Sequence, residues 1–181
     1  MPETVTRELL VQRARDIAPG IGKRAAAAES LRRVPEETIQ EIRNAGLLAA
    51  FTPKRFGGYA LEIGTVIETA REIGEVCGSS AWCLAIYNLH NHLLANFTDA
   101  AQDEVFSASP NPVVCGVFMP GGAGTPVDGG YRLTGEWNFA SGCDHSSHAI
   151  LSGLIRAAPD APPTGLMSFL VRREDLSLIH I

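Results

Sequence analysis

The sequence lacks the features that would assign it to a membrane or export class. No apolar run is long enough to cross a membrane, because Asp, Glu and Arg interrupt every candidate segment. The first eight residues are acidic and contain no apolar signal region. We therefore expect a cytoplasmic protein that has no membrane partner.

Positive charge is also scarce. The formal net charge is -5, whereas binding to a phosphate backbone needs a basic surface, so nucleic acid is excluded as a main partner. The glycine-rich stretch 121–124 lacks the Lys-Ser/Thr ending and the following helix of a phosphate-binding loop, and we interpret it as a flexible hairpin connection. The sequence has no Gly-x-Ser-x-Gly elbow, which argues against a hydrolase.

Cysteine is present but not in a paired pattern. The four cysteines include no Cys-x-x-Cys motif, so neither a disulfide framework nor a structural zinc site is expected. Residues 143–148 contain cysteine and histidine, but in an extended segment these side chains would alternate between faces, and no second cluster completes a tetrahedral set. We predict no metal site.

The remaining composition is that of a globular chain, with 45% hydrophobic and 19% charged residues. Helical spacing and end signals predict helices over residues 6–30, with a kink or break at Pro19-Gly20, and over 35–45, 64–76, 79–97 and 99–106. After Ser109 the character changes, and strands are predicted over 113–118, 130–137, 149–155 and 166–171. Helices followed by strands predict an α+β fold, with a helical domain over 1–108 and a β domain over 109–181.

One segment combines aromatic and hydroxyl side chains at the end of a predicted strand. Within residues 135–145, Trp137 and Phe139 would supply a flat apolar wall, and the Ser141 hydroxyl would supply a hydrogen-bond donor. A flavin site needs such a wall beside its planar ring and a donor at the ring edge. The alternative is a strand end whose aromatic residues belong to the core.

His90 is a second candidate. Its helical spacing places it on the same face as Ile86 and Leu94, whereas His92 points elsewhere. A histidine in an apolar wall could bind or deprotonate a substrate hydroxyl, because its pKa lies near neutrality. The alternative is a histidine that completes a hydrogen-bond network in the core.

Several separated motifs, taken in order, resemble the acyl-CoA dehydrogenase superfamily. They are residues 31–38, the Phe-Gly-Gly loop at 56–58, and residues 76–82, 127–131 and 135–145. Within the superfamily the sequence is most similar to the two-component flavin-dependent monooxygenases that hydroxylate phenols and secosteroids. The resemblance extends from residue 13 to residue 175.

This resemblance implies a flavin-dependent monooxygenase that hydroxylates a small aromatic, phenolic substrate with oxygen through a flavin hydroperoxide. A separate flavin reductase would supply the reduced cofactor, with FMN implied and FAD as the alternative. His90 would lie in the substrate pocket, and the Ser141 hydroxyl would lie near the reactive ring nitrogen. The implied flavin contacts are Trp82, Gly116, Val117, Phe118, Phe139, Ala140 and Ser141.

Members of this family are longer than this chain. Their C-terminal part completes a β-barrel-like middle domain, adds a helical bundle and forms much of a homotetramer interface. The resemblance therefore implies an incomplete form with a partial β domain and an apolar tail at 176–181, inactive on its own. Two other functions stay open: an acyl-CoA dehydrogenase that oxidises an acyl thioester, and a non-catalytic assembly piece.

Overall fold

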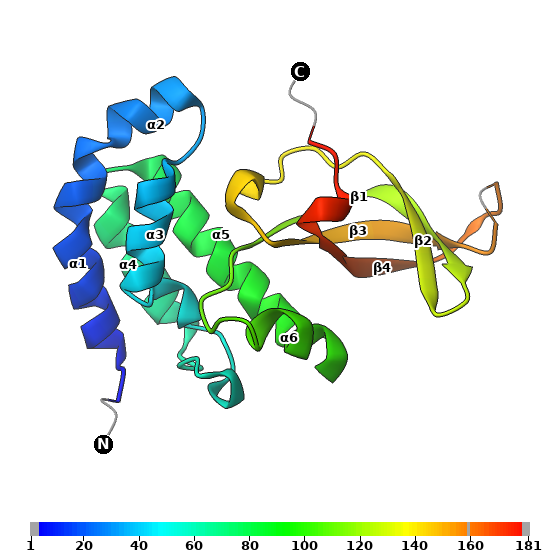
Figure 1. Cartoon of the computed structure of the whole chain (residues 1–181), viewed down its shortest axis with the longest axis horizontal. Coiled ribbons are helices and arrows are strands. Elements are labelled where there is room, and N and C mark those ends of the chain that lie inside the picture. The colour runs from blue at the N-terminus through cyan, green and yellow to red at the C-terminus, as the bar shows by residue number, and fades with distance from the viewer. Residues whose placement is uncertain (1–3, 159, 179–181) are drawn as a thin grey trace. The chain divides into compact units, whose positions relative to one another are not determined.

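The structure, a computed structural model, describes residues 4–158 and 160–178. Its chain divides into two units, Met1–Val113 and Val114–Ile181 (Figure 1). The first unit is helical and the second is built on a β-sheet, which confirms the α+β class. The helical unit contains α1 (Arg7–Lys23), α2 (Ala25–Leu31), α3 (Glu36–Asn44), η1 (Leu47–Ala49), η2 (Lys54–Phe56), α4 (Ile63–Gly74), α5 (Gly78–Leu94) and α6 (Asp99–Phe106).

The first predicted helix is broken at a different residue from the one expected. Helix α1 continues through Pro19, and the chain turns at Arg24 instead. Pro19 is exposed while Ala18 and Ile21 are buried, so core packing on both sides holds the helix together despite the hydrogen bond that proline removes. The Arg24 side chain donates to the Thr38 hydroxyl at 3.0 Å, which ties this turn to α3.

Helix α5 is fixed in the helical unit by two buried asparagines. Asn88 donates to the carbonyl of Leu47 at 2.9 Å, and Asn91 donates to the carbonyls of Leu48 at 3.1 Å and Pro112 at 3.2 Å. Both side chains are fully buried, so these bonds satisfy carbonyls that water cannot reach. The register of α5 against η1 is therefore set by polar contacts as well as by apolar packing.

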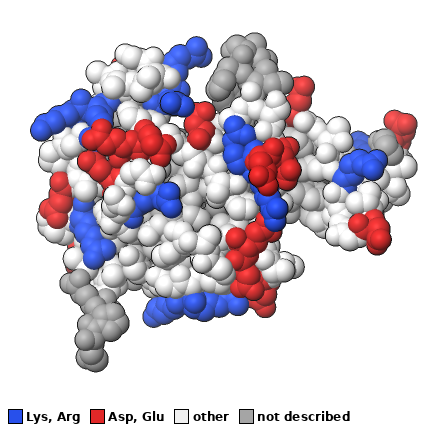
Figure 2. Space-filling view, in the orientation of Figure 1, with Lys and Arg blue, Asp and Glu red and all other residues white. Residues whose placement is uncertain are grey.

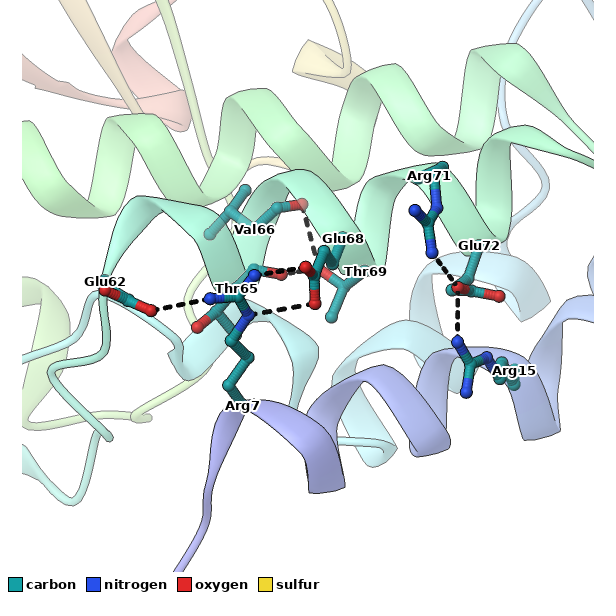
Figure 3. Close-up of polar contacts among 9 residues, drawn as sticks. All are labelled: Arg7, Arg15, Glu62, Thr65, Val66, Glu68, Thr69, Arg71 and Glu72. Atoms are coloured by element: carbon teal, nitrogen blue, oxygen red, sulfur yellow. Dashed lines mark hydrogen bonds and ion pairs between the residues drawn. The ribbon is translucent and has the colours of Figure 1, made fainter.

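Ion pairs join α1 to α4 along one side of the helical unit (Figure 3). Arg7 donates to Glu68 through Nε at 3.0 Å. One turn further along α4, the Glu72 carboxylate accepts from both Arg15 at 3.0 Å and Arg71 at 2.9 Å. These two guanidinium groups lower the pKa of Glu72 to about 2.

The second unit is a four-stranded mixed sheet with the strand order β2-β1-β3-β4. Strand β1 is antiparallel to β2 and parallel to β3, and β3 is antiparallel to β4. Two short 3-10 turns follow β2 and β4. The elements are β1 (Val114–Val127), β2 (Gly130–Gly135), η3 (Cys143–His145), β3 (His148–Arg156), β4 (Pro163–Arg172) and η4 (Arg173–Asp175).

The glycine-rich stretch is part of this sheet, so its interpretation as a flexible connection was wrong. Strand β1 extends to Val127, and Gly122 pairs with Gly135 of β2 and with Gly153 of β3. The pairing of β1 with β3 is irregular, because β1 passes through residues 118–121 while β3 passes only through Ser152. This bulge interrupts the ladder next to Phe118, one of the predicted cofactor contacts.

The predicted apolar tail lies only partly within the described residues, because 179–181 fall outside them. Leu176 packs against the buried cluster formed by Cys115, Ala149 and Leu151. The first part of this tail therefore contributes to the packing of the sheet unit.

Candidate functional site

Trp82 lies on α5, and its side chain is 60% exposed. Leu89 and Leu93 are exposed on the same helical face, since they follow Trp82 at spacings of seven and eleven residues. An exposed row of large apolar side chains on one helix face is typical of a surface that binds a ligand or another protein surface. Trp82 is therefore available to a planar ligand.

His90, the other predicted residue on α5, is buried at 4% exposure. It shares its buried side with Leu94, as the spacing predicted. His92 is exposed instead, and its ring centroid lies 5.0 Å from that of Phe51. The predicted place of His90 in a substrate pocket stays a prediction, with a core histidine as its alternative.

A shallow pocket of about 490 Å³ lies in the helical unit beside His92. Its lining is mostly apolar, with the Glu62 carboxylate as a charged group, and it includes none of the residues predicted from the sequence. The lining residues are Phe51, Ala60, Leu61, Glu62, Ile63, Leu89 and His92.

The loop after β2 holds Phe139 in an unusual conformation. Its φ angle is +63°, and its side chain is 97% exposed. The amide of Ser141 donates to the Phe139 carbonyl at 2.8 Å, and the amide of Cys143 donates to the Ala140 carbonyl at 3.1 Å. A large aromatic residue held in the left-handed region and fully exposed is typical of a functional loop, because folding alone gains nothing from it.

The Ser141 hydroxyl lies in the same tight turn. Within residues 4–158 and 160–178 this hydroxyl makes no hydrogen bond, and only the backbone of Ser141 is used in the turn. A half-buried hydroxyl without a protein partner can donate to or accept from a ligand. The loop therefore presents an aromatic ring and a hydrogen-bonding group together.

Both ends of this loop are attached to the sheet. At one end, the indole Nε1 of Trp137 donates to the Ser152 carbonyl at 2.7 Å. At the other end, the buried Ser146 hydroxyl donates to the Cys143 carbonyl at 2.9 Å and lies 3.3 Å from Sγ of Cys115. Burial raises the pKa of the Cys115 and Cys143 thiols, so both are neutral at neutral pH and this attachment carries no charge.

The two aromatic residues of the predicted wall have different environments. The Trp137 side chain is half-buried and bonded to β3, whereas Phe139 extends into solvent. They do not form one continuous wall, and only Phe139 is open to a ligand.

The predicted residues of β1 pack with this loop. Val117 and Ala140 both contact the buried cluster of Cys115, Ala149 and Leu151. Phe118 follows at the start of the bulge and is 49% exposed. The sheet unit therefore brings Val117 and Ala140 to one cluster, while Trp82 and His90 belong to the helical unit.

The distribution of charged side chains does not indicate a binding site for a highly charged ligand. On the face of the helical unit seen in Figure 2, acidic and basic side chains are interspersed. Among the described residues, no group of His, Cys, Asp or Glu could hold a metal ion. No helix in the described ranges is long and apolar enough to cross a membrane.

Known proteins similar to this chain include several flavin-dependent hydroxylases. The chain is 36% identical over 163 residues to the flavin-dependent monooxygenase, oxygenase subunit HsaA, of Mycobacterium tuberculosis, covering 90% of this chain and 41% of that protein. It is 32% identical over 171 residues to the p-hydroxyphenylacetate 3-hydroxylase, oxygenase component, of Acinetobacter baumannii, covering 94% and 40%. The chain thus spans about two fifths of the length of these curated relatives.

A solved structure agrees with these similarities. XiaF from a Streptomyces species, in complex with FADH2 and glycerol, superposes with a TM-score of 0.91 at 34% identity, covering 97% of this chain and 45% of that one. Residues 4–108 match the family described as acyl-CoA dehydrogenase, N-terminal domain, and this match includes more than half of the chain. The chain therefore belongs to the acyl-CoA dehydrogenase family.

Proposed function

We propose that this chain forms part of the oxygenase component of a two-component flavin-dependent monooxygenase that hydroxylates a phenolic substrate. The names of its relatives support this function, since they include the HsaA oxygenase subunit and p-hydroxyphenylacetate 3-hydroxylase. A separate reductase would supply the reduced flavin.

The observation that carries this proposal is the conformation of the loop at 139–141. Phe139 is 97% exposed on a left-handed backbone, and the Ser141 hydroxyl has no partner within the described residues. A planar, mostly apolar ring with polar atoms at its edge needs these two groups. The loop therefore fits an isoalloxazine ring.

The proposed contacts with the flavin are these. In the sheet unit, Phe139 would offer apolar surface to the ring, and the Ser141 hydroxyl would hydrogen-bond a ring nitrogen. The backbone of Gly116, Val117 and Phe118, which leads into the bulge of β1, would contact the polar edge of the ring. The bound reduced flavin would supply the electrons for oxygen activation.

We propose FMN as the flavin, with FAD as the alternative. Relatives of known structure are described with both, since XiaF was solved with FADH2 and TdsC from Paenibacillus sp. A11-2 with FMN. Equilibrium titration of the protein with each flavin, oxidised and reduced, distinguishes them.

The test of the function is oxygen consumption by the protein supplied with reduced flavin and a series of phenols. We expect substrate-dependent oxygen uptake and a hydroxylated product detected by mass spectrometry. Oxidation of an acyl-CoA thioester with an artificial electron acceptor would indicate the dehydrogenase activity instead. Flavin binding without either reaction would leave the non-catalytic alternative.

A further inference from the structure

Trp137 lies on a surface made of glycine backbone. Gly135 of β2, Gly122 of β1 and Gly153 of β3 are successive neighbours, so three of the four strands have no side chain at this level of the sheet. A Cβ atom added at Gly122 would lie 2.6 Å from Cζ2 of Trp137, and one added at Gly135 would lie 2.9 Å from its Cη2. The same Cβ atoms would also meet backbone, at 2.5 Å from the Thr134 carbonyl oxygen and 2.4 Å from Cα of Gly122, so only glycine fits here against both the neighbouring strand and the indole.

The indole also compensates for the bulge in β1. Ser152 is the β3 residue that the bulge leaves without a partner on β1, because Leu151 pairs with Val117 and Gly153 pairs with Gly122. The Trp137 Nε1–H donates to the Ser152 carbonyl at 2.7 Å. A side chain from the end of β2 therefore reaches across β1 and bonds to β3.

This contact fixes the point at which the chain leaves the sheet. Phe139, with its positive φ, comes two residues after Trp137, and Ser141 comes two residues later again. The turn is bonded to the sheet through Trp137 on one side and Ser146 on the other, and Ala140 packs against the cluster of Cys115, Ala149 and Leu151. A rotation of the indole would shift the position of the Phe139 ring and the Ser141 hydroxyl.

We propose that Trp137, seated on Gly135 and Gly122, is a positioning residue that sets the geometry of the loop at 139–141 for its planar ligand. It acts through the loop and not by touching the ligand. This inference rests on the proposed function, in which that ligand is a flavin.

The sheet offers a matched control for this proposal. Gly124 lies two residues after Gly122 on the same strand face, and a Cβ added there would lie 2.5 Å from Cζ of Phe169. Phe169 belongs to β4 and is separate from the loop. Gly122→Ala would press on the Trp137 indole and also on the Thr134 carbonyl oxygen, 2.5 Å from the added Cβ, whereas Gly124→Ala would press on the Phe169 ring. Of the two rings, only that of Trp137 leads to Phe139.

The experiment measures the dissociation constants of FMN and FAD, oxidised and reduced, with the visible circular dichroism of the bound oxidised flavin and the Tm of the free protein. We expect Gly122→Ala to weaken flavin binding about tenfold, which corresponds to about 1.4 kcal/mol. We also expect it to alter the dichroism of the bound flavin. Gly124→Ala should lower the Tm but change the dissociation constant by less than about twofold.

Trp137→Phe removes the indole hydrogen bond together with the fused ring that lies over Gly122 and Gly135, and it adds no atom to the strands, so it tests the proposal even if Gly122→Ala fails to fold. We expect about fivefold weaker flavin binding with an altered dichroism, because one lost neutral hydrogen bond has an effect of this size. Equal effects of Gly122→Ala and Gly124→Ala, or wild-type binding by Trp137→Phe, would overturn the positioning role. A wild-type protein that binds neither flavin would instead refute the proposed function, and this inference with it.

Discussion

At the scale of single residues, Phe139 combines a strained backbone with an exposed ring. The left-handed conformation of a non-glycine residue costs roughly 1 kcal/mol, and a 97% exposed ring recovers none of it by burial in the free chain. Glu136 and Trp137 set the path of the chain on one side, since the Glu136 amide donates to the Gly121 carbonyl at 3.0 Å. The surrounding contacts therefore impose a conformation that the residue itself does not favour.

Phe139→Gly should raise the free energy of unfolding by about 1 kcal/mol, because glycine adopts positive φ at little cost. The same substitution should weaken flavin binding, because the ring is lost. Phe139→Ala is the matched comparison: it removes the ring but keeps the conformational cost. Denaturant unfolding and flavin titration of both variants test this expectation, and destabilisation by Phe139→Gly would contradict it.

At the scale of elements, buried polar contacts hold α5 in place. Asn91→Ala leaves the carbonyls of Leu48 and Pro112 without their donor in a dry environment, which costs about 2 kcal/mol. Asn96→Ala is the control, because Asn96 donates to the carbonyl of His92 at 2.8 Å in an exposed position. Urea unfolding should show a lower free energy of unfolding for Asn91→Ala than for Asn96→Ala. Equal free energies would show that burial is not the decisive factor.

The contact between α1 and α4 should depend on pH. Arg15 and Arg71 lower the pKa of Glu72 from its ordinary value of 4.5 to about 2 in the folded chain, and Arg7 lowers the pKa of Glu68. The unfolded chain therefore binds more protons than the folded chain in this range. This contribution to stability is complete above pH 4.5 and is lost as the pH falls toward 2.

Glu72→Gln should reduce the difference in unfolding free energy between pH 6 and pH 3, because glutamine cannot titrate. Denaturant melts across this pH range provide the measurement. A pH dependence unchanged by Glu72→Gln would mean that the ion pairs with Arg15 and Arg71 do not contribute to it.

At the scale of the whole molecule, bound flavin should stabilise the fold by mass action. At a flavin concentration one hundred times the dissociation constant, the free energy of unfolding should rise by about 2.7 kcal/mol. Thermal melts with FMN and with FAD give the order of preference. Adenosine diphosphate is the control, because it lacks the isoalloxazine ring, and equal stabilisation by it would contradict binding through Phe139 and Ser141.

The sequence by itself determined the order of helices and strands and most of their positions. Apolar spacing and end signals at Glu36, Glu37 and Gly46 are local properties of the chain, so α3 was found within one residue at each end. The motif at 135–145 likewise indicated aromatic rings and a hydroxyl at the end of a strand, and the family resemblance of the motifs at 31–38, 56–58 and 76–82 agrees with the family match over residues 4–108.

Only the tertiary structure decided which residues face a ligand and which support them. Glycines 121, 122 and 124 carry no local strand signal, and they lie in a strand because Trp137 and Phe169 cover them from elsewhere in the chain. Trp137 and Phe139 are both aromatic residues of the same motif, but their environments differ. The Trp137 indole N–H donates to the carbonyl of Ser152, the residue that the bulge in β1 leaves without a β1 partner. Contacts between distant segments set these differences, and no local pattern in the sequence encodes them.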